Sequence, residues 1–155
     1  MLKQFKQLAL ETEGRYATES ELDFIHVFIE SAQNRIKTYE KIRNEEESLL
    51  DDIQATAIEI DAHAFYRDNQ DMQAVGRRDR KFLLRHIAAS LLIADIDRLR
   101  DGLLIWLSTI MKAQRVERLS SILCQAERRV LEQRLSTTEF ETIKSALAVS
   151  QSLIG

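Results

Sequence analysis

The chain of 155 residues contains no proline and only four glycines. Because these two residues interrupt helices more often than any others, few positions in this sequence can end one. Segments that alternate apolar and polar residues, as strands do, are missing as well, so the sequence predicts an all-α fold. With 45% hydrophobic and 30% charged residues, a chain of this length can bury its own core. We expect one domain over residues 1–155.

Capping signals and glycines divide the chain into helices. Capping boxes, in which two side chains satisfy free amides at a helix start, are predicted at Thr18 with Glu21 and at Ser136 with Glu139. A globin-like assembly of six to eight helices crossing ridge into groove is the expected architecture, and a plain helical bundle is the alternative. Helix breaks are expected at Gly14, Gly76 and Gly102. Further helices are expected up to about residue 64 and over residues 76–94, 95–110 and 116–134, with a polar loop at 66–75.

Net charge and cysteine content exclude several classes of function. A formal charge of −3 gives no general attraction to nucleic acid or to an anionic membrane. Cys124 is the single cysteine, so no internal disulfide or zinc cluster is expected. Without a signal peptide or an 18-residue apolar run, we expect a cytoplasmic chain with no membrane insertion. Catalytic side-chain sets and phosphate loops are missing too, so we expect no enzyme.

Positive charge is concentrated around the start of the helix expected at residue 76. Between residues 67 and 85, six basic residues accompany three aspartates, although the net charge of the chain is negative. The planar fork of arginine donates paired hydrogen bonds to carboxylates, such as the two propionates of haem or of a linear tetrapyrrole. The alternative is an exposed face of mutual ion pairs. The candidate ligand-binding residues are Arg77, Arg78, Asp79, Arg80 and Lys81.

Several motifs occur in a fixed order and spacing. The helix at residue 76 reads GRRD at residues 76–79 and FLLR at residues 82–85, followed by a small and apolar run. Near the N-terminus, GRY at residues 14–16 precedes TESEL at residues 18–22. Over about residues 1–107 the chain resembles the phycobiliprotein (phycobilisome protein) family, whose chromophore helix begins with Cys-x-Arg-Asp. The resemblance implies a globin-like fold with an N-terminal helical arm.

The resemblance also implies roles for particular residues and shows two departures. Arg78 matches a family arginine that meets a pigment propionate, and Asp79 matches an aspartate that accepts hydrogen bonds from the pyrrole nitrogens. Gly76 stands where the family has the cysteine that links the bilin, and Asp71 and Met72 stand where it has an arginine pair. We therefore expect no covalent cofactor, and a bilin would bind non-covalently. Bilin biosynthesis-associated globins and divergent phycobilisome-like subunits are relatives of this kind.

An assembly surface is expected on the arm, residues 1–18. Its apolar stripe would be marginally stable alone, so it needs a surface to lie on. By resemblance, Glu11 and Arg85 match a pair that joins two subunits in the family. A closed twofold dimer, homomeric or formed with a related globin, would use the same patch twice. Two alternatives are that the arm folds on its own domain, and that Arg85 pairs within its own chain. The candidate interface residues are Leu2, Phe5, Leu8, Glu11, Arg15, Tyr16 and Arg85.

Three functional hypotheses follow. The first is a dimeric phycobiliprotein-related globin that binds a bilin non-covalently, or binds proteins of bilin biosynthesis or of the phycobilisome, with Phe82, Leu83 and Trp106 as apolar walls or core residues. The second is a pigment-free structural or regulatory dimerisation protein. The third is a haem-binding globin sensor, for which His86 is the histidine to test, although a lone helical histidine is more often a packing or surface residue.

Overall fold

The computed structural model describes residues 2–68 and 70–155, with the backbone alone for residues 2 and 3. The all-α prediction is confirmed, because helices account for nearly all of the regular structure. The longer helices are α1 (Leu2–Glu11), α2 (Glu19–Asn44), α3 (Glu46–Ile60), α4 (Gln73–Leu92), α6 (Ile105–Gln114), α7 (Glu117–Arg134) and α8 (Thr137–Ile154). The short α5 (Ile96–Leu99) and a π-helical turn, η1 (Arg100–Leu104), lead into α6. A small hairpin consists of β1 (Tyr66–Arg67) and β2 (Gln70–Asp71).

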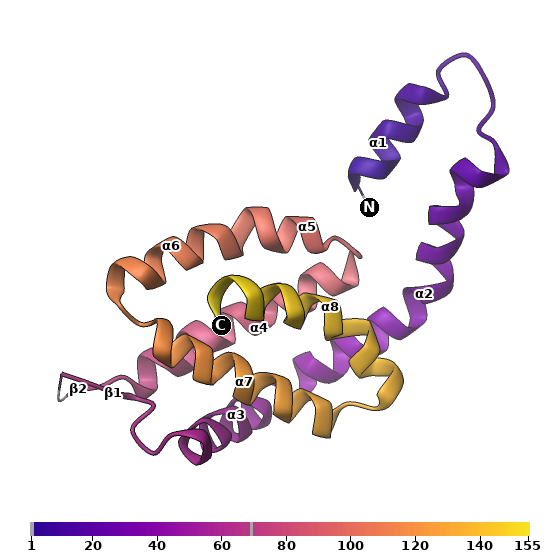
Figure 1. The fold of residues 1–155 in the computed structure, drawn as a ribbon. Helices are drawn as coiled ribbons and strands as arrows, with labels where there is room; N and C mark the ends of the chain where they lie inside the picture. The colour runs from indigo at the N-terminus through magenta and orange to yellow at the C-terminus, as the bar shows by residue number, and fades with distance from the viewer. Residues whose placement is uncertain (1, 69) are drawn as a thin grey trace.

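The helices form a body and a projecting arm (Figure 1). The body contains α3 to α8 together with the C-terminal half of α2. The arm consists of α1 and the N-terminal half of α2, which lie side by side and extend away from the body. The ring of Phe5 on α1 meets the ring of Phe24 on α2, with centroids 5.3 Å apart. The arm therefore holds its own two helices together but leaves most of their surface uncovered.

The core of the body is built around α4. Leu84 and Ile87 on this helix are fully buried, and they pack in one cluster with Leu104 of η1, Leu131 of α7 and Ile143 of α8. The apolar residues of α4 recur every three or four positions, which places them on one face of the helix. Burial of this face is the main contribution to the stability of the body.

Helix starts agree with the predicted capping signals. The carboxylate of Glu21 accepts hydrogen bonds from the Thr18 backbone N–H at 2.8 Å and from its hydroxyl at 3.0 Å. The Ser136 N–H donates to Glu139 at 2.8 Å, and both halves of the second box form at the start of α8. A glutamate in the first turn thus satisfies the N-cap amide at both starts, as the capping boxes predicted.

Two of the three predicted glycine breaks are wrong. Gly76 lies inside α4, which begins three residues earlier, and Gly102 lies inside the π-helical turn. Only Gly14 ends a helix, with a φ of +84° that suits glycine. The α4 start is explained by Asp71, whose side chain accepts a hydrogen bond from the Gln73 backbone N–H at 2.8 Å. The expected loop at 66–75 is thus a hairpin followed by the first turn of α4.

The helices of residues 2–68 and 70–155 include no candidate membrane span. None of them is both long enough and apolar enough to cross a bilayer.

Candidate functional site

Most of the cationic cluster on α4 is paired with the acidic start of α3. Arg77 reaches Glu47 at 2.8 Å and Asp51 at 2.7 Å. Lys81 lies 3.4 Å from Glu46, and Arg85 binds the same carboxylate through two nitrogens, at 2.5 and 2.7 Å. These cations therefore form mutual ion pairs, which was the alternative to a ligand-binding cluster. Their positive charge clamps α3 to α4 and is largely neutralised there.

The clamp also changes the acidity of its carboxyl groups. Hydrogen bonding from Arg85 lowers the pKa of Glu46, and hydrogen bonding from Lys81 and Arg77 lowers that of Glu47. Each pair is at least partly exposed, so each contributes little to the stability of the protein. Arg77 and Lys81 therefore serve the packing of two helices and have little charge left for a ligand.

Arg80 occupies an environment that the sequence did not predict. Its side chain is 3% exposed, and it donates a hydrogen bond at 2.9 Å to Glu127 on α7, which is 1% exposed. The Arg80 Nη1 also lies 3.6 Å from the Cys124 sulfur. Within the described residues, the Arg80 Nε and the Glu127 Oε1 have no hydrogen-bond partner. A charged pair is thus buried in the core with part of its hydrogen-bonding capacity unused.

Burial dominates the titration of this cluster. Loss of solvent raises the pKa of Glu127, and the neighbouring Arg80 charge opposes that rise. Burial likewise raises the pKa of the Cys124 thiol, so Cys124 is a buried, protonated side chain. Sequence reasoning could not find Glu127, because a lone glutamate on a charged helix gives no sign that it points inward.

Arg78 and Asp79 are the two candidate ligand-binding residues whose side chains lie at the surface. Arg78 is 74% exposed and binds the Asp79 carboxylate through two nitrogens, at 2.9 and 2.8 Å. Asp79 is half-exposed and also lines a narrow slot between α4, α6 and α7. The residues that the resemblance assigns to a pigment thus lie beside a cavity and are bound to each other.

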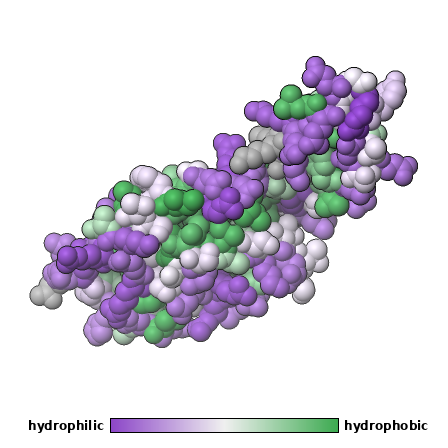
Figure 2. Space-filling view, turned by 45° about the horizontal axis from the view of Figure 1, so that its top comes forward, coloured by the Kyte–Doolittle hydropathy of each residue, from purple (hydrophilic) through white to green (hydrophobic). Residues whose placement is uncertain are grey.

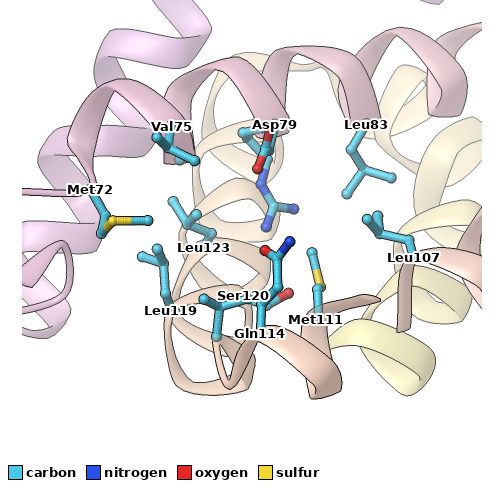
Figure 3. A pocket seen from close by; sticks show the side chains of 13 residues that line it. Met72, Val75, Asp79, Leu83, Leu107, Met111, Gln114, Leu119, Ser120 and Leu123 are labelled. Carbon is cyan, nitrogen blue, oxygen red and sulfur yellow. The ribbon is translucent and has the colours of Figure 1, made fainter. Parts of the chain in front are cut away.

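The slot has apolar walls and a few polar groups. Met72 and Leu119 lie toward one end and Leu83 and Leu107 toward the other, with Asp79 above Gln114 and Ser120 between them (Figure 3). Its volume is about 50 Å³, whereas ligand pockets usually hold ~300–1,000 Å³. The slot is therefore too small to hold a ligand of ordinary size.

Gly76 lines the same slot at the position where the resemblance has a cysteine. A Cβ placed on Gly76 would lie 3.1 Å from Cε1 of Phe65 and 3.7 Å from Leu123. Phe65 is buried in the core. The ring of Phe65 therefore occupies the space next to the helix that a side chain at position 76 would need.

Two aromatic residues expected in the slot or the core lie elsewhere. Phe82 is 49% exposed and Trp106 is 58% exposed, so neither packs in the core. Phe82 stacks on His86 with ring centroids 4.2 Å apart. Only Leu83 of the three proposed wall residues is both buried and part of the slot.

The arm presents most of the predicted interface residues to solvent. Tyr16 is 96% exposed, and Phe5 is exposed at its edge while its ring meets Phe24. Arg15 binds Glu21 at 2.7 and 2.9 Å, and Glu11 accepts a hydrogen bond from Gln7. Leu8 is half-buried, and the side chain of Leu2 lies outside the described residues. Arg85 pairs with Glu46 within its own chain, a partner that the sequence did not suggest.

A broad groove lies on the body next to the arm. Two adjoining hollows of about 560 and 420 Å³ share Tyr39 and run between α2, α4 and α5. Figure 2 shows hydrophobic side chains gathered in the middle of the body on the face that it presents. The lining of the groove includes the apolar Ala89, Ile93 and Leu103, the basic His86, Arg85 and Arg98, and the acidic Glu46.

The histidines do not converge on the slot. His86 lines the groove, where its Nδ1 lies 2.9 Å from the Phe82 carbonyl oxygen. His63 contacts the ring of Tyr66, and His26 is exposed on α2. Among the described residues, no group of three or more His, Cys, Asp or Glu side chains could hold a metal ion.

The body of packed helices with a projecting arm is the globin-like architecture expected from the sequence. The sequence model of the phycobilisome protein family matches residues 8–149, which is nearly the whole chain. The chain therefore belongs to the phycobilisome protein family, and the family and the fold class are both confirmed. Family membership also implies assembly with related chains. A search of curated proteins gives no match.

Proposed function

We propose that this protein is a non-enzymatic, dimeric member of the family that binds a linear tetrapyrrole without a covalent bond. The observation that carries the proposal is the position of Asp79. Its carboxylate lies at the edge of an apolar slot and can accept hydrogen bonds from the pyrrole N–H groups of a bilin. Arg78 can leave Asp79 for a propionate, since the pair is exposed and weak.

Binding requires the slot to open. With a volume of about 50 Å³, the slot has room for a few water molecules but not for a pigment. The wall that can yield is α6, because each of its residues is at least partly exposed. An element with so little buried surface can separate from the body at low cost. The ligand would then lie between α4 and α6, with Asp79 on one side.

Titration of the purified protein with biliverdin, phycocyanobilin and haemin, followed by absorbance and circular dichroism, tests the proposal. A saturable induced signal with a bilin, reversed by denaturation, is expected. The double variant Arg78→Ala/Asp79→Ala should weaken bilin binding about tenfold or more, since it removes charge-assisted hydrogen bonds. The matched control is Arg100→Ala/Asp101→Ala, an exposed neighbouring pair on η1. Equal binding by both double variants would contradict the proposed site.

The same titration separates the two other hypotheses. A Soret band with haemin alone, lost on His86→Ala, would support a haem sensor. Absence of any signal with all three ligands would support a pigment-free protein of structural or regulatory function, whose partners are related globins or proteins of bilin biosynthesis or the phycobilisome. We place the protein in the cytoplasm.

Dimerisation is the second part of the proposal. The arm needs a covering surface, and the groove between α2, α4 and α5 has the size and the charge to receive it. The arm carries the exposed acids Glu11 and Glu13, and the groove carries Arg85 and Arg98. We propose that each arm lies in the groove of a second copy or of a related chain, with Glu11 competing with Glu46 for Arg85.

A further inference from the structure

A second cavity adjoins the slot and is rich in arginine. Its volume is about 120 Å³, and three different segments contribute one arginine each. Arg67 comes from β1, Arg115 from the turn after α6, and Arg118 from the first turn of α7. These residues are far apart in the sequence, so the fold and not a local charge run brings them together.

The start of α7 adds to the positive potential of this cavity. Val116 is the N-cap residue, and its apolar side chain cannot accept a hydrogen bond from the free amides of the first turn. Val116, Arg118 and Leu119 all line the cavity. The backbone N–H groups and the positive end of the helix dipole therefore favour an anion at the place where the arginines meet.

Arg115 is held in a conformation that its side chain does not favour. Its φ of 55° and ψ of 45° are in the left-handed region, at a helix end where glycine is the usual residue. Within residues 2–68 and 70–155, no carboxylate forms an ion pair with Arg115. An arginine kept at a position that suits glycine, with its charge uncompensated, points to a role for that charge.

The other two arginines have carboxylate neighbours that leave capacity for a ligand. Arg67 lies 3.6 Å from Asp68, which is 87% exposed, and Arg118 pairs with Asp61. Three arginines against these two aspartates leave one net positive charge. Arginine has five N–H donors, so one contact with an aspartate does not use up its hydrogen-bonding capacity.

The cavity shares a wall with the slot. Met72, Val116 and Leu119 line both. We infer that the two form one site for an amphipathic acid, in which the slot takes an apolar body and Arg67, Arg115 and Arg118 bind its carboxylate. This inference rests on the proposed function and extends it, since the acid would be a propionate of the bilin. It adds to Arg78 a second carboxylate anchor, formed by β1, the α6–α7 turn and the start of α7.

Acid and ester forms of one ligand provide the test. We would measure the binding of biliverdin and of biliverdin dimethyl ester to the wild-type protein and to Arg115→Gln/Arg118→Gln. The control is Arg128→Gln/Arg129→Gln, which removes the same charge from an exposed part of α7 outside the cavity. Wild type and control should bind the acid about tenfold or more tightly than the ester, and the double variant should lose most of this preference, keeping only the part that Arg78 contributes.

An undiminished preference of the double variant for the acid, or equal binding of acid and ester by wild type, would overturn the anchor while leaving the bilin proposal intact. Failure of wild type to bind biliverdin at all would instead refute the bilin. In that case cis-parinaric acid and its methyl ester, followed by fluorescence, decide the anchor by the same comparison. If wild type prefers the acid to the ester and the double variant does not, the arginine anchor is upheld. If wild type binds both equally, or binds neither, the anchor is overturned.

Discussion

At the scale of single residues, the buried pair of Arg80 and Glu127 has the largest energetic consequences. Two opposite charges lie where little solvent reaches them, 2.9 Å apart, and each retains an unused hydrogen-bonding atom. Removing one partner of such a pair is far more damaging than removing both, because the remaining charge stays buried without compensation.

We expect Arg80→Met to lower the free energy of unfolding by about 3–5 kcal/mol. The double variant Arg80→Met/Glu127→Leu should be close to wild type, or more stable by up to about 4 kcal/mol. Urea denaturation of the three proteins measures this difference. Equal losses in the single and double variants would show that the pair does not interact as described.

The same substitution carries a pH dependence of known sign. Burial raises the pKa of Glu127, and Arg80→Met removes the charge that opposes the rise. When the pKa of a carboxyl group is higher in the folded than in the unfolded protein, the group stabilises the fold most at a pH below its unfolded-state pKa. This stabilisation is lost as the pH rises toward the folded-state pKa. The loss in Arg80→Met should therefore be smaller near pH ~4 than near pH ~8.

Arg115 allows stability and binding to be separated. A residue with a side chain is strained in the left-handed backbone conformation, and glycine is not. Arg115→Gly should therefore raise the free energy of unfolding by up to about 1 kcal/mol. It should also weaken the binding of an anionic ligand. Ala94 provides a matched control, because it has a φ of 50° and lies outside the arginine-rich cavity. Ala94→Gly should stabilise without a change in affinity, and thermal unfolding with acid titration measures both quantities.

Residue positions show where sequence reasoning reached its limit. The sequence placed Arg77, Arg80 and Lys81 in one cationic group, yet they point in different directions, toward α3, toward the core and toward α3 again. Helical spacing gives the direction of each side chain only when the neighbouring helices are known. The interior position of Arg80 depends on Glu127, which lies 47 residues away.

At the scale of elements, the start of α2 depends on one carboxylate. Hydrogen bonds from Arg15, and then from the backbone and hydroxyl of Thr18, lower the pKa of Glu21 to about 2. This side chain thus ties the connection after α1 to the first turn of α2. A capping carboxylate near a helix N-terminus also meets the favourable end of the helix dipole.

The helix content of the arm should therefore decrease at low pH. A carboxylate with a lowered pKa stabilises fully above its unfolded value, about 4.5, and loses the contribution as the pH falls toward about 2. Circular dichroism should show a partial loss of helix over this interval in wild type. Glu21→Gln should already lack that helix at neutral pH, and Glu19→Gln, in the same turn, should behave as wild type. An unchanged titration in Glu21→Gln would refute the role of this cap.

Helix boundaries were predictable where a side chain contacts the backbone locally. The boxes at Thr18 and Ser136 are of this kind, and Asp95 caps α5 through the Arg98 N–H at 3.1 Å. Gly76 and Gly102 were misread, because a glycine breaks a helix only if nothing else stabilises it. At Gly76 the close approach of Phe65 gives glycine a packing role inside the helix.

At the scale of the whole molecule, the projecting arm makes a self-contained monomer a poor arrangement. Leu10 and Tyr16 are largely exposed on the arm, and so are Val27 and Ile29 on its α2 half. Exposed apolar surface of this extent is typical of an interface. The sequence predicted the arm and its apolar stripe, but it could not show that the arm stands clear of the body.

We expect sedimentation at micromolar concentration to show a dimer, or a complex with a related chain when both are present. Leu10→Glu should shift the species toward monomer, because it places a charge in the covered surface. Ile58→Glu is the control, since Ile58 is also an exposed apolar residue and lies on α3, away from the arm. Equal effects of the two substitutions would indicate general loss of solubility or stability, and a purely monomeric wild type would exclude the homodimer.

The electrostatic clamp between α3 and α4 has a consequence for kinetics. Its cations and carboxylates lie side by side, so an approaching anion meets short-range dipoles whose field decays quickly and is screened beyond about 8 Å at physiological salt. The clamp therefore does little to draw an acidic ligand in from solution. An acidic ligand would reach this face of α3 and α4 by unguided collision, and differences between ligands at this face would appear in how long each one stays.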